Sequence, residues 1–510
     1  MPFPRSSGLL LHPTSLPGPY GIGALGASAH AFIDFLARAG QRIWQLLPLG
    51  PTGYGDSPYQ SFSAFAGNPL LIDLDRLVAQ DWLAPDRLEA DVATLTASPV
   101  DAVDYARVIA HRRALWPSAL ERFERMASPE TRARLDAFHA AHAAWLPEYT
   151  LFMALKEAHD QVAWTHWEPA IARRDPDAVD RWTRRLAREM RIHAFTQFLF
   201  FEQWQDVRAR CDARGISLMG DVPIFVAHDS ADVWANRHLF NLRADGTPAV
   251  VAGVPPDYFS LTGQLWGNPH YQWDVMARDG YAWWIARIRS ALSLVHVIRL
   301  DHFRGFDAAW QVSGDADTAM NGEWVPGPGE TFFDALRQAL GPLPFVAENL
   351  GVITPHVEAL RHRYDLPGMA ILQFAFGNDP QAPSFKPHNH ERNLVVYTGT
   401  HDNDTTVGWW TGDAGHSTRS ADDIARERAF ASRYLGTDGR EIHWDLIRTA
   451  LASVAHTAIA PVQDLLGLGS EARMNRPGDP SGNWRWRARA DALTPAIADR
   501  LATLTRTFDR

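Results

Sequence analysis

Short apolar segments alternate with longer amphipathic segments along most of this chain. Eight apolar segments have the length and composition of buried strands, and they cover residues 8–15, 42–50, 217–226, 295–304, 345–351, 368–374, 393–400 and 461–468. Helical patterns accompany many of them, at 28–39, 279–294, 354–364 and 443–456. This alternation predicts a parallel sheet with crossover helices, of the α/β class, and eight such units fit a (β/α)8 TIM barrel.

Two intervals between the predicted strands are too long for a single crossover helix. Between the second and third strands, helical patterns at 101–126, 129–144 and 178–214 predict that residues 51–216 are an inserted, mainly helical subdomain. After the third strand, residues 227–279 are rich in Gly, Pro, Trp and Tyr, which predicts a long ordered lid loop over the barrel mouth. We therefore expect residues 1–510 to be one catalytic barrel with these two insertions.

The fourth predicted strand changes from apolar to charged where it ends. Residues 295–306 have the sequence VHVIRLDHFRGF, in which Arg299, Asp301, His302 and Arg304 follow a β-branched run. A β/α barrel presents catalytic groups at the carboxyl ends of its strands. Arg299 and Asp301 are two residues apart, so their side chains leave a strand on the same side. A cation beside a carboxylate keeps it ionised, which suits a nucleophile or an electrostatic stabiliser better than a proton donor.

Carboxylates also stand at the ends of three other predicted strands: Asp221 in LMGDVP, Glu348 in FVAENLG, and Asp402 after VVYTGTH. A single carboxylate at a strand end is more often a helix cap or a partner in a surface ion pair. Together with Asp301, however, they lie at the same end of strands three, four, five and seven. Closure of the barrel would bring all four around its axis.

Two carboxylates that face each other across a substrate are the requirement for cleaving a glycosidic bond. Asp301 is the candidate nucleophile. Glu348 has Ala347, Asn349 and Leu350 as its neighbours and no adjacent cation, so a raised pKa and the role of proton donor are predicted for it. Asp402 would then stabilise positive charge on the oxocarbenium-like sugar.

Composition and charge exclude several other classes of protein. The net charge of −10 argues against a nucleic-acid partner, and the apolar runs are far too short to span a membrane. A single cysteine, Cys211, excludes an internal disulfide and a cysteine metal cluster, and the N-terminus lacks the apolar core of a signal peptide, so we expect a cytoplasmic protein. The 20 tryptophans favour a carbohydrate ligand only slightly, because most of them are expected in the core.

The motifs for cofactors and metals are weak. Residues 21–26, GIGALG, match the dinucleotide fingerprint, but two prolines separate them from the preceding strand, so a turn leading into a helix is the preferred interpretation. Residues 401–404, HDND, lack the glycine and distal glutamate of a calcium loop. No His-Glu-x-x-His or Gly-x-Ser-x-Gly motif occurs. No cofactor and no metal are therefore predicted.

Beyond these site segments, three motifs carry a resemblance to a known family: GLLLHPTSLPGPYG at 8–21, GYGDSPYQSFSAFAGNP at 53–69 and GSEARMN at 469–475. With the segments around Asp301, Glu348 and Asp402, they make the chain similar over nearly its whole length to the amylomaltases, or 4-α-glucanotransferases. The resemblance implies a β/α barrel with inserted subdomains and no separate C-terminal β domain, which fits the helical pattern at 490–508.

The resemblance also implies roles for individual residues. Asp301 would be the nucleophile, Glu348 the general acid/base and Asp402 the transition-state stabiliser. The family's sugar contacts at the cleavage point would be Arg299, His401, Asp221, Tyr59 and Asn475, and Trp266 in GQLWGNP would be the acceptor-side platform on a lid loop. The implied substrates are malto-oligosaccharides and the α-1,4-glucans derived from starch or glycogen, and a monomer is the favoured oligomeric state.

The implied reaction is the transfer of a glucan segment to the 4-hydroxyl of an acceptor glucan or glucose, by a retaining double displacement through a covalent glycosyl-enzyme. An α-amylase-like hydrolase is the first alternative, since water and sugar can take over the same intermediate. The second alternative is a non-catalytic glucan-binding protein, which would keep the aromatic residues and would not need the acid/base pair.

Overall fold

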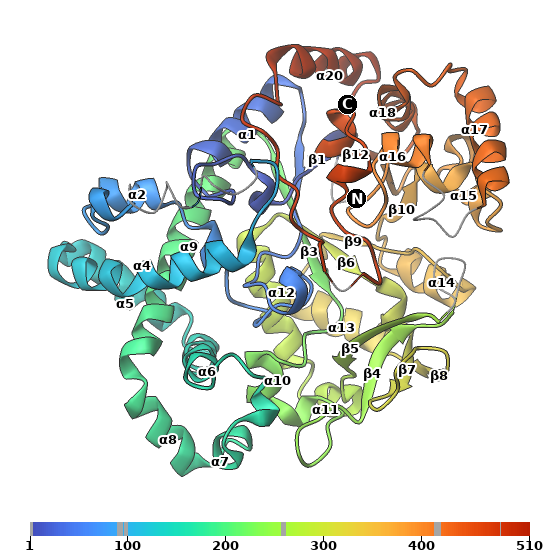
Figure 1. Cartoon of the computed structure of the whole chain (residues 1–510). Coiled ribbons are helices and arrows are strands. Elements are labelled where there is room, and N and C mark those ends of the chain that lie inside the picture. The colour runs from blue at the N-terminus through green and yellow to red at the C-terminus, as the bar shows by residue number, and fades with distance from the viewer. Residues whose placement is uncertain (1–3, 89–94, 96–99, 257–261, 413–419, 480) are drawn as a thin grey trace.

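A barrel of parallel strands forms the centre of the molecule (Figure 1). The computed structural model describes residues 4–88, 95, 100–256, 262–412, 420–479 and 481–510. Within these ranges, eight parallel strands follow one another in the order β1 (Ser6–Leu10), β2 (Ile43–Gln45), β3 (Ser217–Pro223), β6 (Val297–Asp301), β9 (Phe345–Ala347), β10 (Gly368–Ile371), β11 (Leu394–Tyr397) and β12 (Thr457–Pro461), which pairs with β1. A hydrogen bond from Ala347 N to Pro367 O of 2.8 Å nearly closes the sheet between β9 and β10. The predicted (β/α)8 barrel is confirmed.

The barrel strands are buried on both faces, as expected of parallel strands covered by helices. Every residue of β1, β9, β10, β11 and β12 is buried. In β6 the burial ends at Leu300, and only Asp301 is partly exposed. The change from apolar to charged residues in this segment therefore marks the point where the strand leaves the core.

Helices surround the barrel at most of the predicted positions. In the described residues outside the two insertions, the α-helices are α1 (Ala27–Arg38), α12 (Ala282–Leu294), α13 (Gly329–Leu340), α14 (Pro355–Arg363), α15 (Ala382–Phe385), α16 (Thr406–Thr411), α17 (Ala421–Leu435), α18 (Ile442–Ala452), α19 (Val462–Leu465) and α20 (Pro495–Thr507). Thr354 caps α14, because its Oγ1 accepts a hydrogen bond from Val357 N at 3.4 Å. The glycine-rich segment 21–26 is a turn that leads into α1, as preferred from the sequence, with Gly21 at a φ of +73°.

The prediction of the eighth strand was wrong in its position. The strand is β12, Thr457–Pro461, whereas most of the predicted segment 461–468 is α19 and the turn after it. Pro461 explains the error in physical terms, since proline has no N–H to continue a ladder and its fixed φ suits the residue before a helical turn. The helix predicted before it, at 443–456, ends instead at Ala452, and the sequence pattern assigned residues 457–460 to no element.

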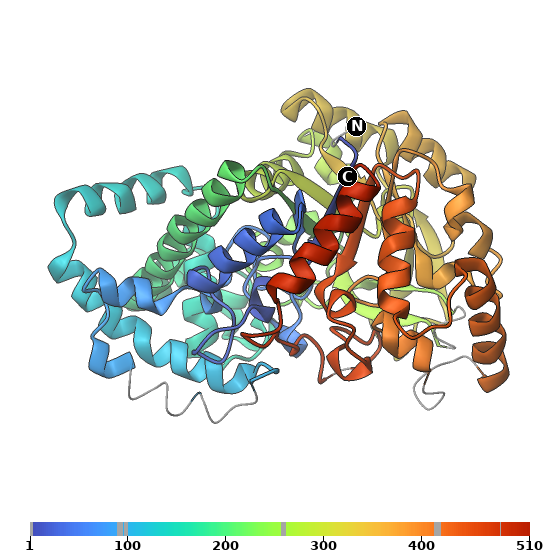
Figure 2. The same cartoon turned by 90° about the horizontal axis from the view of Figure 1, so that it is seen from above.

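The interval between β2 and β3 is helical, as predicted. The α-helices of its described part are α2 (Leu74–Ala79), α4 (Tyr105–Met126), α5 (Pro129–Ala141), α6 (Leu146–Ala158), α7 (Pro169–Ala172), α8 (Pro176–Arg185) and α9 (Ala187–Ala213). Figures 1 and 2 show these blue to green helices gathered on one side of the barrel. The long helix α9 packs against α4, α5 and α6 and also against α1, and so joins this group to the barrel. That the group is a subdomain of its own stays a prediction.

The segment 227–279, predicted as a long loop, contains regular elements, and its role as a lid over the barrel mouth stays a prediction. This segment contains α10 (Ala231–Ala235), β4 (Val250–Val254), β5 (Gln264–Pro269) and α11 (Trp273–Arg278). In the described part of the chain, β4 and β5 join β7 (Ala308–Ser313) and β8 (Gly322–Pro326) in an antiparallel sheet of order β5-β4-β7-β8. The sequence did not reveal this sheet, because β4 finds its second partner, β7, beyond β6 and more than fifty residues further along the chain.

The two ends of the chain lie near β1 and β12 (Figure 1), and the second view also shows them close together (Figure 2). Arg510 donates hydrogen bonds to Ser6 O at 3.1 Å and to His456 O at 3.0 Å. Across the described ranges, no helix combines the length and the apolar character that crossing a bilayer requires.

Candidate active site

Arg299 is the centre of a charged cluster at the carboxyl ends of β3 and β6. The register of the two strands places Asp221 opposite Arg299 and Pro223 opposite Asp301. Arg299 Nη1 lies 2.6 Å from Asp221 Oδ2 and 2.8 Å from Asp301 Oδ1. The prediction that Arg299 and Asp301 point to the same side is confirmed. The Asp221 side chain is fully buried and that of Asp301 is 26% exposed, so Asp301 is the carboxylate that a substrate can reach.

Asp221, the fully buried carboxylate of this cluster, has a raised pKa. Burial raises the pKa of Asp221 to about 7, and neighbouring Asp301 adds to the rise, although Arg299 opposes it. For Arg299 itself, burial opposes the charge, but the two carboxylates outweigh burial and raise the pKa of the guanidinium well above its ordinary value. Arg299 therefore stays charged, and Asp221 depends on Arg299 for its own charge.

Removing this guanidinium should destabilise the fold in a pH-dependent way. We expect Arg299→Met to lower the free energy of unfolding by about 3–5 kcal/mol at pH 7.5, because Asp221 is left buried without its cation. A carboxyl whose pKa is raised on folding loses stability as pH rises through that pKa, so the loss should be smaller at pH 5, where Asp221 is protonated. Urea unfolding at both pH values measures this, with Arg299→Lys as the charge-preserving control. Equal losses at pH 5 and 7.5 would contradict the assignment.

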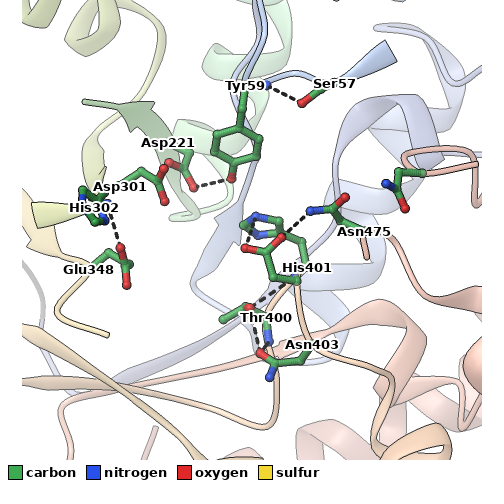
Figure 3. Close-up of polar contacts among 12 residues, drawn as sticks. Ser57, Tyr59, Asp221, Asp301, His302, Glu348, Thr400, His401, Asn403 and Asn475 are labelled. Atoms are coloured by element: carbon green, nitrogen blue, oxygen red, sulfur yellow. Dashed lines mark hydrogen bonds and ion pairs between the residues drawn. The ribbon is translucent and has the colours of Figure 1, made fainter. Parts of the chain in front are cut away.

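Glu348 directly follows β9, and two peptide N–H groups bind its carboxylate. Figure 3 shows the bond from His302. Oε2 accepts from His302 N at 2.7 Å, and Oε1 accepts from Leu350 N at 3.0 Å. His302 has a φ of +51°, in the left-handed region, so the chain turns sharply after Asp301. This turn gives Glu348 a fixed donor beside the end of β6.

The pKa of Glu348 is raised to about 8, chiefly by burial and further by Asp301. Arg299 and the two N–H donors lower it and so limit the rise. The direction agrees with the sequence prediction of a raised pKa. The sequence argument, that no cation lies next to Glu348, was incomplete. Arg299 on the adjacent strand β6 does lower the pKa of Glu348, and burial outweighs it. Glu348 therefore carries a proton at neutral pH and can lose it at mildly alkaline pH.

Asp402 lies in the loop after β11, on the other side of the cluster. Its Oδ1 accepts a hydrogen bond from Asn475 Nδ2 at 2.6 Å, and its Oδ2 is 3.3 Å from His401 Nε2. Arg473 Nη2 donates to the Asp402 backbone oxygen at 2.6 Å. The side chain of Asp402 is 45% exposed, so its carboxylate is held in place while it remains open to a ligand.

Tyr59 connects the two halves of the site, as the close-up shows (Figure 3). Its hydroxyl donates to Asp221 Oδ2 at 3.0 Å. Its ring stacks on that of His401, with centroids 5.2 Å apart and planes 17° apart. Burial lowers the pKa of His401, so this imidazole is neutral at neutral pH and can donate or accept a hydrogen bond.

Trp266 lies on β5, beside His302, whose backbone N–H binds Glu348. Its ring meets the His302 ring edge to face, with centroids 4.9 Å apart. Its Nε1 donates to Gln264 Oε1 at 3.2 Å, and Gln60 Nε2 donates to the Trp266 backbone oxygen at 3.4 Å. Trp266 is partly exposed, which leaves indole surface for a ligand beside the acid/base candidate.

The structure brings all nine residues named from the sequence into one connected site: Tyr59, Asp221, Trp266, Arg299, Asp301, Glu348, His401, Asp402 and Asn475. Sequence reasoning missed Arg473 and the backbone N–H of His302. Arg473 lies two residues before Asn475, so its place in that segment was a usable signal. The contribution of His302 depends on backbone conformation, for which the side-chain pattern gives no signal.

The same arrangement limits the chemistry that is possible. Among the residues that the structure describes, no three His, Cys, Asp or Glu side chains are grouped so as to hold a metal ion. A reachable carboxylate paired with arginine, a carboxyl with a raised pKa and a third carboxylate with an amide partner can attack, protonate and stabilise a sugar at its anomeric carbon.

Comparison with known proteins identifies relatives over the whole chain. The family model of the 4-alpha-glucanotransferases matches residues 11–493. The chain is 50% identical to the 4-alpha-glucanotransferase of Thermus thermophilus, with 100% of both sequences covered, and 50% identical to that of Synechocystis, with 99% of this chain and 98% of the relative covered. Its fold is similar to that of an amylomaltase from Streptococcus agalactiae solved in complex with acarbose, with a TM-score of 0.93, 38% identity and 99% of each chain covered.

Proposed function

The chain belongs to the 4-alpha-glucanotransferase family, and on this premise we propose that it transfers α-1,4-glucan segments by a retaining double displacement at Asp301. The observation that carries the proposal is the pairing of two different carboxyl groups at the barrel mouth. Asp301 is reachable and held by Arg299, whereas Glu348 has a pKa raised to about 8 and two peptide donors. Retaining glycosidic chemistry requires one carboxyl group of each kind.

In the first step, an Asp301 oxygen attacks the anomeric carbon of the donor glucan. The bond between that carbon and the departing oxygen breaks, and Glu348 gives its proton to the leaving sugar. The ion pair with Arg299 fixes the direction of the Asp301 carboxylate. Asp402, held by Asn475, lies on the other side and stabilises the positive charge that develops on the sugar ring.

In the second step, the ionised Glu348 takes the proton of an acceptor's 4-hydroxyl, and the acceptor oxygen attacks the covalent intermediate. The ester to Asp301 breaks and a new α-1,4 bond forms, so one glycosidic bond replaces another. The N–H groups of His302 and Leu350 stabilise the Glu348 carboxylate during this step. The substrates that we propose are malto-oligosaccharides and α-1,4-glucans derived from starch or glycogen, and the compartment that we propose is the cytoplasm.

Product analysis with maltotriose tests this function. We expect glucose together with oligosaccharides longer than maltotriose, with almost no increase in total reducing ends, because each bond broken is replaced. Chromatography of the products combined with a reducing-end assay measures both quantities. Reducing ends that increase with every bond broken would show a hydrolase instead.

The Trp266 side chain, on the predicted lid, should determine what fraction of the glycosyl-enzyme is hydrolysed by water. The Trp266 ring lies beside His302, whose N–H binds Glu348, so an acceptor sugar on this indole would be near the base. We expect Trp266→Ala to lower transfer about tenfold more than hydrolysis, because the acceptor loses its stacking surface and water gains access. The ratio of new glucan to new reducing ends measures this, and Trp266→Phe is the matched control. An unchanged ratio in Trp266→Ala would contradict the role of the lid.

A further inference from the structure

Trp484 has a backbone conformation that is rare for a bulky residue. Its φ is +64°, in the left-handed region, where a Cβ is crowded and glycine or asparagine is usual. The residue is buried, with 5% of its surface exposed. Unfavourable conformations of this kind persist only where the surrounding structure enforces them, and they cluster at functional sites.

Hydrogen bonds on both sides enforce this conformation. Trp484 N donates to Met474 O at 2.7 Å, and the Tyr105 hydroxyl donates to Trp484 O at 3.0 Å. The next residue, Arg485, accepts from Val103 N at 2.6 Å through its backbone oxygen. Trp484 is thereby fixed between the segment that carries Asn475 and the start of α4.

The Trp484 ring packs against two residues of the active site. Its centroid is 5.7 Å from that of Tyr59 and 5.9 Å from that of His401. These two rings stack on each other, so the three form one cluster. The cluster reaches the charged groups at both of its ends, because Tyr59 donates to Asp221 and His401 lies next to Asp402.

This placement gives Trp484 an indirect role. It is too deeply buried to offer a sugar its ring, yet it contacts both aromatic side chains that join the halves of the site. Tyr59 and His401 come from different loops, after β2 and β11, and an indole packed against both rings fixes their separation. Removing the indole would empty the volume beside both rings, and a cavity gives neighbouring side chains room to rotate.

We propose that Trp484 is a positioning residue of the transfer reaction, which holds the rings of Tyr59 and His401, and through them Asp221 and Asp402, in the geometry that the transition state requires. This inference rests on the proposed function and deepens it.

Three substitutions separate the ring from the backbone. Trp484→Ala removes the ring and keeps the unfavourable φ, Trp484→Gly removes the ring and relieves the backbone, and Trp484→Phe keeps a smaller ring. We expect the alanine variant to lose about 100-fold in kcat for maltotriose with little change in KM, because small displacements of catalytic groups cost this much. The glycine variant should melt at a higher temperature than the alanine variant and lose at least as much kcat. The phenylalanine variant should lose only about 10-fold.

Trp82 provides the matched control, because it is 7% exposed and packs on Phe123 among the inserted helices, with ring centroids 4.9 Å apart. Trp82→Ala should lower the melting temperature as Trp484→Ala does and leave kcat unchanged. Activity that follows melting temperature across all variants would overturn the proposal, as would full activity in Trp484→Gly. If the alanine and glycine variants do not fold, full kcat in Trp484→Phe overturns it.

A double-variant test identifies the route of the effect. If Trp484 acts through Tyr59, then Trp484→Ala combined with Tyr59→Ala should lose less kcat than the product of the two single losses. Losses that multiply would overturn that route. If the wild-type chain forms no glucans longer than maltotriose, the proposed function itself is contradicted. An active wild type together with a fully active Trp484→Ala variant would contradict only this inference.

Discussion

Asp301→Asn is expected to reduce kcat on the order of 10⁵-fold while the protein stays folded, as loss of a covalent nucleophile does in other enzymes. The amide keeps the size of the side chain and cannot form the glycosyl ester. Asp221 retains Arg299 at 2.6 Å, so the buried charge that matters for stability remains paired. The loss should therefore appear in catalysis and not in the melting temperature.

The measurement is initial-rate disproportionation of maltotriose, with thermal unfolding of the same preparation. Asp307→Asn is the matched control, because Asp307 follows the same turn after β6 and its backbone bonds to Arg304 and Gly327, which are not among the nine site residues named above. We expect that control to keep its kcat. A kcat for Asp301→Asn within tenfold of the wild type would contradict the assignment of the nucleophile. A wild-type protein that binds glucan and shows no catalysis would favour a binding protein.

Glu348→Gln is expected to lower kcat/KM for maltotriose about 10³-fold, the typical contribution of a general acid. The pKa of Glu348 is about 8 in the folded protein, so the proton needed in the first step is present at neutral pH and is lost as pH rises through 8. Wild-type kcat/KM should accordingly decline above about pH 8, and this alkaline decline should disappear in the glutamine variant.

Rates between pH 5 and 10 with two donors test this role. Maltotriose needs protonation of its leaving oxygen, whereas an α-maltosyl fluoride has a leaving group that departs without it. We expect Glu348→Gln to form the glycosyl-enzyme from the fluoride almost as fast as the wild type. An equal loss with both donors would show that Glu348 serves another purpose, such as binding.

The sequence predicted those parts of the site that depend on a single strand. The apolar run before Asp301, the spacing of two from Arg299 and the apolar neighbours of Glu348 are local features, and the structure agrees with each. The pairing of Arg299 with Asp221 was not predicted, because it depends on the register between β3 and β6, two strands that are more than seventy residues apart along the chain.

The errors in the fold have the same origin. The antiparallel sheet escaped prediction because β4 pairs with β7 across the whole of β6. The eighth strand was displaced because its alanine-containing residues have no strong strand propensity and Pro461 marks its end. Trp484 was missed since a left-handed backbone leaves no trace in the pattern of apolar and polar residues.

The covalent intermediate on Asp301 is the central claim, and it can be trapped directly. Glu348→Gln should be mixed with α-maltotriosyl fluoride: the carbon–fluorine bond breaks, an ester to Asp301 forms, and the absent base leaves the ester long-lived. Mass spectrometry of the intact protein and of its peptides should find one maltotriosyl group, on the peptide that contains Asp301. A variant that consumes the fluoride and carries no sugar, or carries it on another residue, would contradict the account.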